Sequence, residues 1–126
     1  MTLKEAVDIF DSRCENDFSL TEKIKWISNL DGLIKTNIID THEGGNNIDF
    51  LPYSIDSDKN TKLLVPEPFA EIYIFYMLCQ AYLSRSEFAF YENAASLYNN
   101  AYYYFATYYN RTHLPKQDNS ITGYKG

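Results

Sequence analysis

The sequence predicts an all-α fold: a four-helix bundle-like subunit with a long aromatic C-terminal helix and an irregular insertion over residues 37–67. Three observations predict it. Apolar residues recur at spacings of three and four over four stretches, as on the buried face of an α-helix. The pattern Ser/Thr-x-x-Glu, which caps helix N-termini, precedes three of these stretches. The chain has 126 residues, 45% of them apolar, which suits one domain with a real core.

The first two helices each follow a capping pattern. Thr2 with Glu5 opens a helix expected over residues 3–14, and Ser19 with Glu22 opens a second over residues 20–35. Each helix has one apolar face. These faces comprise Leu3, Ala6, Val7, Phe10 and Cys14 in the first helix, and Leu20, Ile24, Ile27 and Ile34 in the second.

Residues 37–67 interrupt the helical pattern. Residues 41–47 include Gly44 and Gly45 and have the composition of a turn. Two short apolar runs, 48–50 and 62–65, flank a polar loop at 56–60, so a short β-hairpin is expected here. Irregular segments of this length in small domains are usually either functional or disordered. Phe50 and Tyr53 indicate that part of this one packs against the rest of the chain.

The third and fourth helices follow the insertion. Pro68 suits the first position of a helix expected over residues 68–83, because the missing proline N–H costs nothing there. Ser84 with Glu87 then marks the start of a fourth helix over residues 85–110. At about 1.5 Å per residue this last helix is roughly 38 Å long.

The last helix carries more aromatic surface than a small bundle can bury. Ten aromatic residues fall between Phe88 and Tyr109. Tyrosine tolerates partial exposure to solvent and is enriched in interface cores, so we expect part of this surface to contact another subunit. The alternative is a monomer whose tyrosine-rich core leaves some rings exposed. Expected interface residues are Tyr91, Tyr98, Tyr103, Tyr104 and Tyr108, whereas Tyr102 and Phe105 are expected in the core.

No residue pattern indicates catalysis, a cofactor or a bound metal. Asp40, His42 and Glu43 match no ligand spacing. Cys14 and Cys79 fall within helical patterns and are interpreted as reduced core residues. The net charge of −6 argues against sequence-specific nucleic-acid binding. The most apolar run, residues 72–79, is far too short to span a bilayer.

Three short stretches, in order along the chain, resemble one known family. They are residues 38–44 (IIDTHEG), 63–69 (LLVPEPF) and 106–116 (ATYYNRTHLPK). Together with the aromatic last helix, they resemble the small head–tail connector, or adaptor, proteins of tailed phages and prophages. The likeness covers residues 19–116. The acidic loop at 54–61 and the residues after 116 do not match the family pattern.

The resemblance implies a structural protein of the virion neck, assembled in the bacterial host cytoplasm. About twelve copies would form a ring on the portal protein, extend the DNA channel and dock the next neck or tail protein. Double-stranded DNA would pass without specific binding, which suits the negative net charge. Loop 40–62 is expected to contact a neighbouring subunit or the next ring. No enzyme activity, cofactor or membrane contact is implied.

The same resemblance suggests how the chain is organised. Residues 1–115 would form a single helical adaptor domain, and residues 116–126 a flexible tail that gains order on binding. Portal docking is expected to use Asn110, Arg111, Thr112, His113, Leu114, Pro115 and Lys116.

The alternative function is a helical protein–protein interaction module that binds a peptide in an aromatic groove. Residues 94–105 superficially resemble part of a tetratricopeptide-type unit. The absence of a second repeat counts against it, because single repeats rarely bury enough surface to be stable.

Overall fold

The computed structural model describes residues 1–117, and this part of the chain is helical, which confirms the all-α prediction. Four α-helices lie in the order α1 (Leu3–Arg13), α2 (Leu20–Asn37), α3 (Glu71–Ser84) and α4 (Phe88–Thr112). Two single 3₁₀ turns, η1 (Ile39–Thr41) and η2 (Gly45–Asn47), follow α2. Within residues 1–117, no helix is both long enough and apolar enough to cross a membrane.

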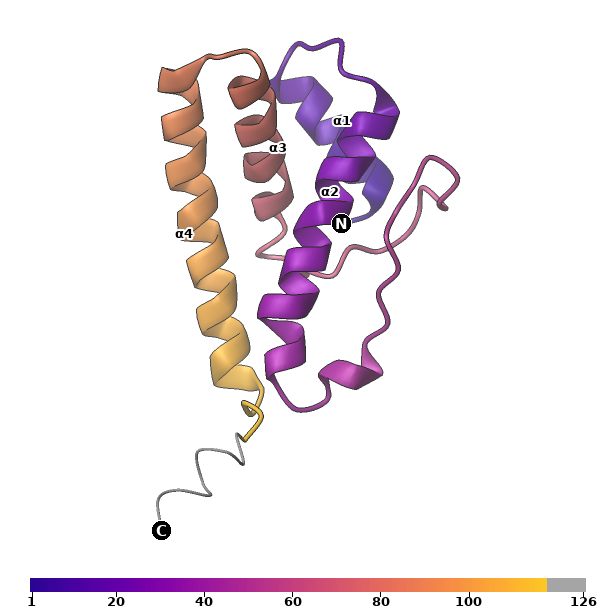
Figure 1. Ribbon diagram of the computed structural model, residues 1–126, viewed down its shortest axis with the longest axis vertical. Helices are drawn as coiled ribbons and strands as arrows, with labels where there is room; N and C mark the ends of the chain where they lie inside the picture. Colours follow the sequence, from indigo (N-terminus) through magenta and orange to yellow (C-terminus); the bar gives the residue numbers. More distant parts are fainter. Residues whose placement is uncertain (118–126) are drawn as a thin grey trace.

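Helix α3 is the central element of the fold. It packs against α1, α2 and α4, whereas α4 rests mainly on α3 and forms one side of the molecule (Figure 1). α1, the first half of α2 and the loop at 54–61 lie on the opposite side of α3 (Figure 1). The largest fully buried side chains include Tyr73, Phe10, Phe105, Leu30 and Met77. The hydrophobic core is therefore built around α3, and α4 covers only one side of it.

The N-termini of α1 and α2 form as their capping residues predict. Thr2 accepts a hydrogen bond from the Glu5 backbone N–H, and Glu5 accepts one from the Thr2 backbone N–H, which completes the capping box. Ser19 accepts from the Glu22 backbone N–H at 3.1 Å. These side-chain acceptors satisfy amides that have no partner within the helix.

The predicted capping box at the start of α4 is wrong. Ser84 is the last residue of α3, and its hydroxyl donates to the Gln80 carbonyl one turn earlier (2.8 Å). The N-cap of α4 is Glu87, which makes no side-chain capping bond. The apolar pattern of α3 continues to its last turn, so Ser84 stays helical and cannot cap the next helix.

Pro68 is not the first residue of α3. The Glu67–Pro68 peptide bond is cis, and the Phe69 N–H donates to the Pro66 carbonyl at 2.9 Å. This bond closes a turn over residues 66–69, so α3 begins only at Glu71.

The predicted β-hairpin is also wrong, because its two runs pair with other parts of the chain or with nothing. The 62–65 run lies beside the N-terminus, where the Leu63 N–H donates to the Met1 carbonyl and the Leu3 N–H donates to the Thr61 carbonyl. An isolated antiparallel bridge joins Thr2 and Lys62. The N-terminal residues thus pair with backbone groups that a hairpin would have used.

Candidate interaction surfaces

A buried carboxylate fastens the irregular segment to the helices. Asp31, on α2, is fully buried. It accepts hydrogen bonds from the hydroxyls of Tyr53 (2.6 Å) and Tyr73 (2.6 Å) and from the Leu64 backbone N–H (3.1 Å). Tyr73 in turn accepts from the Val65 N–H at 2.7 Å. One side chain therefore ties residues 53 and 64, and through Tyr73 residue 65, to α2 and α3.

Burial dominates the ionisation of this cluster. It raises the pKa of the Asp31 carboxyl above its ordinary value, against the opposing effect of the three hydrogen bonds. The pKa of Tyr73 is raised well above its ordinary value by burial and then by the neighbouring carboxylate. Tyr73 therefore remains a neutral donor to Asp31, and we interpret the cluster as structural. Sequence analysis missed it, although a lone aspartate within the apolar stripe of α2 was a visible signal.

The predicted docking segment after α4 pairs with the chain after α2. The Glu43 N–H donates to the Leu114 carbonyl (2.7 Å), and the Lys116 N–H donates to the Thr41 carbonyl (3.0 Å). An antiparallel bridge joins His42 and Pro115. Residues 38–44 and 106–116, two of the three stretches that carry the family resemblance, thus form one junction.

Histidine and tyrosine rings fill this junction. His42 is buried, with Nδ1 2.6 Å from the Ile38 carbonyl and Nε2 2.8 Å from Asn110 Oδ1. Its ring meets the Tyr109 ring edge-on, with 4.9 Å between centroids, and His113 stacks on the Tyr109 ring at 3.8 Å. The third stretch reaches the same helix, because Phe69 packs against Phe105 and Tyr108 of α4.

The seven predicted portal-docking residues divide into two groups. His113 is half-buried and, although Asn110 is exposed, its side-chain oxygen contacts His42, so both contribute to the fold. Arg111, Thr112, Leu114, Pro115 and Lys116 are exposed, Leu114 at 71%. The structure therefore holds the backbone of this segment in place while leaving most of its side chains accessible.

The five predicted interface tyrosines also fall into two groups. Tyr103 and Tyr104 are 65% and 61% exposed, whereas Tyr91, Tyr98 and Tyr108 are half-buried. Tyr98 packs against Tyr76 of α3, and burial raises its pKa. Tyr102 is half-buried and Phe105 fully buried, in line with their predicted core positions.

The solvent side of α4 is nearly uncharged and carries several large apolar side chains. Its large exposed residues, which we call the α4 outer face, are Phe88, Phe90, Leu97, Tyr103 and Tyr104, at 49–65% exposure. Fourteen residues of α4 are exposed, and two of them, Glu92 and Arg111, are charged. α1 and α2 together also expose fourteen residues, seven of them charged. Depletion of charge with retention of aromatic rings is typical of interface cores rather than of solvated surfaces.

Sequence analysis did not single out Phe88, Phe90 or Leu97 as exposed. The signal was the seven-residue spacing of Phe90, Leu97 and Tyr104, which puts all three on one line along a helix. That line lies beside the seam that faces α3, and the sequence alone did not separate the two.

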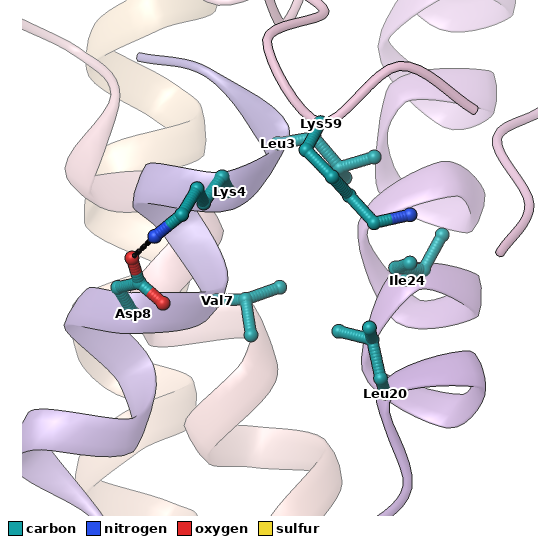
Figure 2. A pocket seen from close by; sticks show the side chains of 7 residues that line it. All are labelled: Leu3, Lys4, Val7, Asp8, Leu20, Ile24 and Lys59. Carbon is teal, nitrogen blue, oxygen red and sulfur yellow. Dashed lines mark hydrogen bonds and ion pairs between the residues drawn. The ribbon is translucent and has the colours of Figure 1, made fainter. Parts of the chain in front are cut away.

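An apolar hollow lies on the other side of the molecule. Leu3 and Val7 of α1 face Leu20 and Ile24 of α2, and the Lys59 side chain reaches across the opening between them (Figure 2). The hollow has a volume of about 200 Å³. An ion pair between Lys4 and Asp8 stands at its margin on α1 (Figure 2).

Residues 1–117 contain no group of three or more side chains suited to hold a metal ion. Cys14 and Cys79 are free and buried, and burial raises the pKa of the Cys79 thiol to about 11. A thiol with a raised pKa is a poor nucleophile at neutral pH.

Comparisons with protein-family models, with curated proteins and with solved structures find no match to this chain. The surfaces described above therefore carry the functional argument.

Proposed function

We propose that this chain is a structural head–tail connector subunit of a tailed phage or prophage. In this proposal about twelve copies form a ring on the portal protein, extend the DNA channel and dock the next neck or tail protein. The observation that carries the proposal is the α4 outer face, a set of five large exposed apolar side chains on a helix whose solvent side has almost no charge. A monomer gains nothing from keeping such a surface in water.

The size of this surface suits a subunit contact. Four of its residues are aromatic and 58–65% exposed. With roughly 200 Å² per aromatic side chain, these rings offer on the order of 500 Å². A standard interface takes about 800 Å² from each partner, so the rings supply more than half of one side.

The exposed side chains of Arg111, Thr112, Leu114, Pro115 and Lys116 suit a second contact, with the portal. Their backbone is already held by bonds to Thr41 and Glu43, so binding orders few additional groups. Preorganisation of this kind strengthens binding by lowering its entropic cost.

A matched pair of substitutions on α4 tests the assembly surface. Tyr104→Asp places a charge at a position that is 61% exposed, so the subunit should stay folded and fail to assemble. Phe105→Asp buries an unpaired charge and should unfold the subunit. Leu33→Asp, at a 44% exposed position on α2 and outside loop 40–62, is the control that should fold and assemble normally.

The readout is light scattering after size exclusion, with circular dichroism as the test of folding. Each chain is measured alone and with a portal protein of the same phage or prophage. The wild-type chain should form a ring alone or on the portal, and Tyr104→Asp should not. A wild-type monomer that ignores the portal at micromolar concentration contradicts the proposal. Capture of one linear peptide motif by that monomer would instead favour the peptide-binding module.

A further inference from the structure

We propose that the contact between neighbouring subunits is head-to-tail: Phe88 of one copy enters the hollow between α1 and α2 of the next. The inference rests on the proposed ring and identifies the surface of the second copy that covers the α4 outer face. A closed ring of more than two copies needs two different, complementary surfaces on each subunit. If α4 instead packed against α4 of another copy, a two-fold dimer would result.

The two surfaces lie on opposite sides of one subunit and at similar height. α4 forms one side of the molecule, and α1 with the first half of α2 lies across α3 from it (Figure 1). The first half of α4 is level with the N-terminal half of α2 (Figure 1). Phe88 is the first residue of α4, and the α2 residues of the hollow, Leu20 and Ile24, belong to that N-terminal half. A chain of such contacts can therefore run sideways from subunit to subunit.

The hollow accepts one aromatic ring without a hydroxyl. Its volume of about 200 Å³ exceeds the roughly 150 Å³ apolar cavity that binds benzene in an engineered protein. Leu3, Val7 and Ile24 form its apolar wall and are buried, whereas its charged residues stand at the margin. A phenylalanine ring matches this wall and brings no hydroxyl that needs a partner. Phenylalanine is therefore favoured over Tyr103 or Tyr104 as the residue that enters.

Two exposed phenylalanines are available, and their surroundings separate them. Phe90, 58% exposed, already packs against Tyr82 of its own chain at 5.5 Å. Phe88 is 59% exposed and has no aromatic partner within the described part of the chain. Phe88 is therefore the ring that is free to enter another subunit.

Charges beside Phe88 and beside the hollow are complementary. Glu92 lies one helical turn after Phe88, on the same side of α4, and makes no ion pair among residues 1–117. Lys59 reaches across the hollow, and its ammonium donates to the carbonyls of Ile55 and Ser57 rather than to a carboxylate. A Phe88 ring in the hollow would bring Glu92 towards Lys59 of the neighbouring copy.

Cysteine cross-linking between two full-length variants tests the contact. A Phe88→Cys chain is mixed with a Leu20→Cys chain under mild oxidation, at the concentration or on the portal where the wild type assembles. Leu20 lines the hollow and is 39% exposed, and the native Cys14 and Cys79 are buried. The mixture should give a disulfide-linked dimer containing one copy of each chain. Leu33→Cys in place of Leu20→Cys is the control and should cross-link at least about tenfold less, because Leu33 is 44% exposed but lies nine residues after Ile24 on α2, outside the hollow.

The outcomes separate this inference from the proposed function. Phe88→Cys chains that cross-link only with each other indicate an α4-to-α4 contact and overturn the inference, although assembly itself stands. The absence of a cross-link in wild-type-like rings overturns it as well. A wild-type chain that never assembles, alone or on the portal, refutes the proposed function and the inference together.

A charge exchange gives an independent measurement. Phe88→Ala should weaken subunit association by about 10- to 100-fold. Glu92→Lys and Lys59→Glu should each weaken it, because each places like charges at the contact between identical chains. Mixing the two chains should restore association as an assembly in which they alternate, since every contact then joins opposite charges. Thermal melting of each variant alone verifies its fold. Association unchanged by all three substitutions contradicts the proposed contact.

Discussion

Removal of the Tyr73 hydroxyl tests whether the Asp31 cluster holds the irregular segment in place. Tyr73→Phe keeps the ring, which is fully buried, and removes the oxygen that donates to Asp31 and accepts from the Val65 N–H. Two buried groups then lose a partner at once. Val65 itself is fully buried, so water does not replace the lost acceptor without a rearrangement.

The expected loss is about 3 kcal/mol of unfolding free energy. A hydrogen bond to a charged group contributes roughly 1.5–3 kcal/mol, and an unsatisfied buried N–H costs roughly 1–3 kcal/mol. The two effects share one oxygen and are not simply additive. At about 2.1 cal/mol/K per residue, a chain of 126 residues has an unfolding entropy near 0.26 kcal/mol/K, so Tm should fall by about 11 °C.

Urea unfolding followed by circular dichroism measures the loss, and Tyr109→Phe is the matched control. The Tyr109 hydroxyl is buried and has no hydrogen-bond partner within residues 1–117, so its removal should leave stability unchanged or raise it by about 1 kcal/mol. Equal effects of the two substitutions, or a loss below about 1 kcal/mol for Tyr73→Phe with an unchanged m-value, would refute this account of the cluster.

Three further predictions concern single sites. Burial raises the pKa of Asp31 above its ordinary 3.8, so its contribution to stability is fully present below pH 3.8 and is lost as pH rises through the raised pKa. As the pH rises through this range, the unfolding free energy of the wild type, measured in urea titrations, should fall relative to that of Asp31→Asn. A relative increase would contradict a raised pKa of Asp31. Gly45→Ala should destabilise more than Gly44→Ala in thermal melts, because a Cβ at Gly45 would lie 2.3 Å from a backbone carbonyl. A Cβ at Gly44 would meet no atom, so Gly44→Ala costs only the strain of a side chain at a φ of 84°. Thr2→Ala should cost about 1 kcal/mol in urea unfolding through the lost α1 cap, and an effect near zero would show that the cap is unimportant.

The helices could be predicted from the sequence because their periodicity is local. The apolar face of α1, from Leu3 to Phe10, and the capping residues Thr2 and Ser19 act within one or two turns. α4 was predicted to start at residue 85 but starts at Phe88. Ser84 is the last residue of α3, and the capping pattern alone does not show whether a serine ends one helix or caps the next.

The irregular segment could not be predicted, since its partners are distant in sequence. The 62–65 run is held by the N-terminal residues and by Asp31, which is more than thirty residues away from Leu64. For the candidate surface, helical periodicity separated Phe105 from Tyr103 and Tyr104. It did not reveal that α4 packs chiefly on one neighbour, which leaves Phe88 and Phe90 in solvent.

The bonds between residues 1–4 and 59–63, and between residues 41–43 and 114–116, have a consequence for the order of events during synthesis. The stretch between α2 and α3 draws much of its backbone pairing from one segment translated before it and one translated after it. It therefore cannot reach its final arrangement while residue 116 is still on the ribosome. A nascent chain stalled after α3 should consequently be open to proteolysis between α2 and α3, and resistance there should appear only once residues 114–116 have left the ribosome.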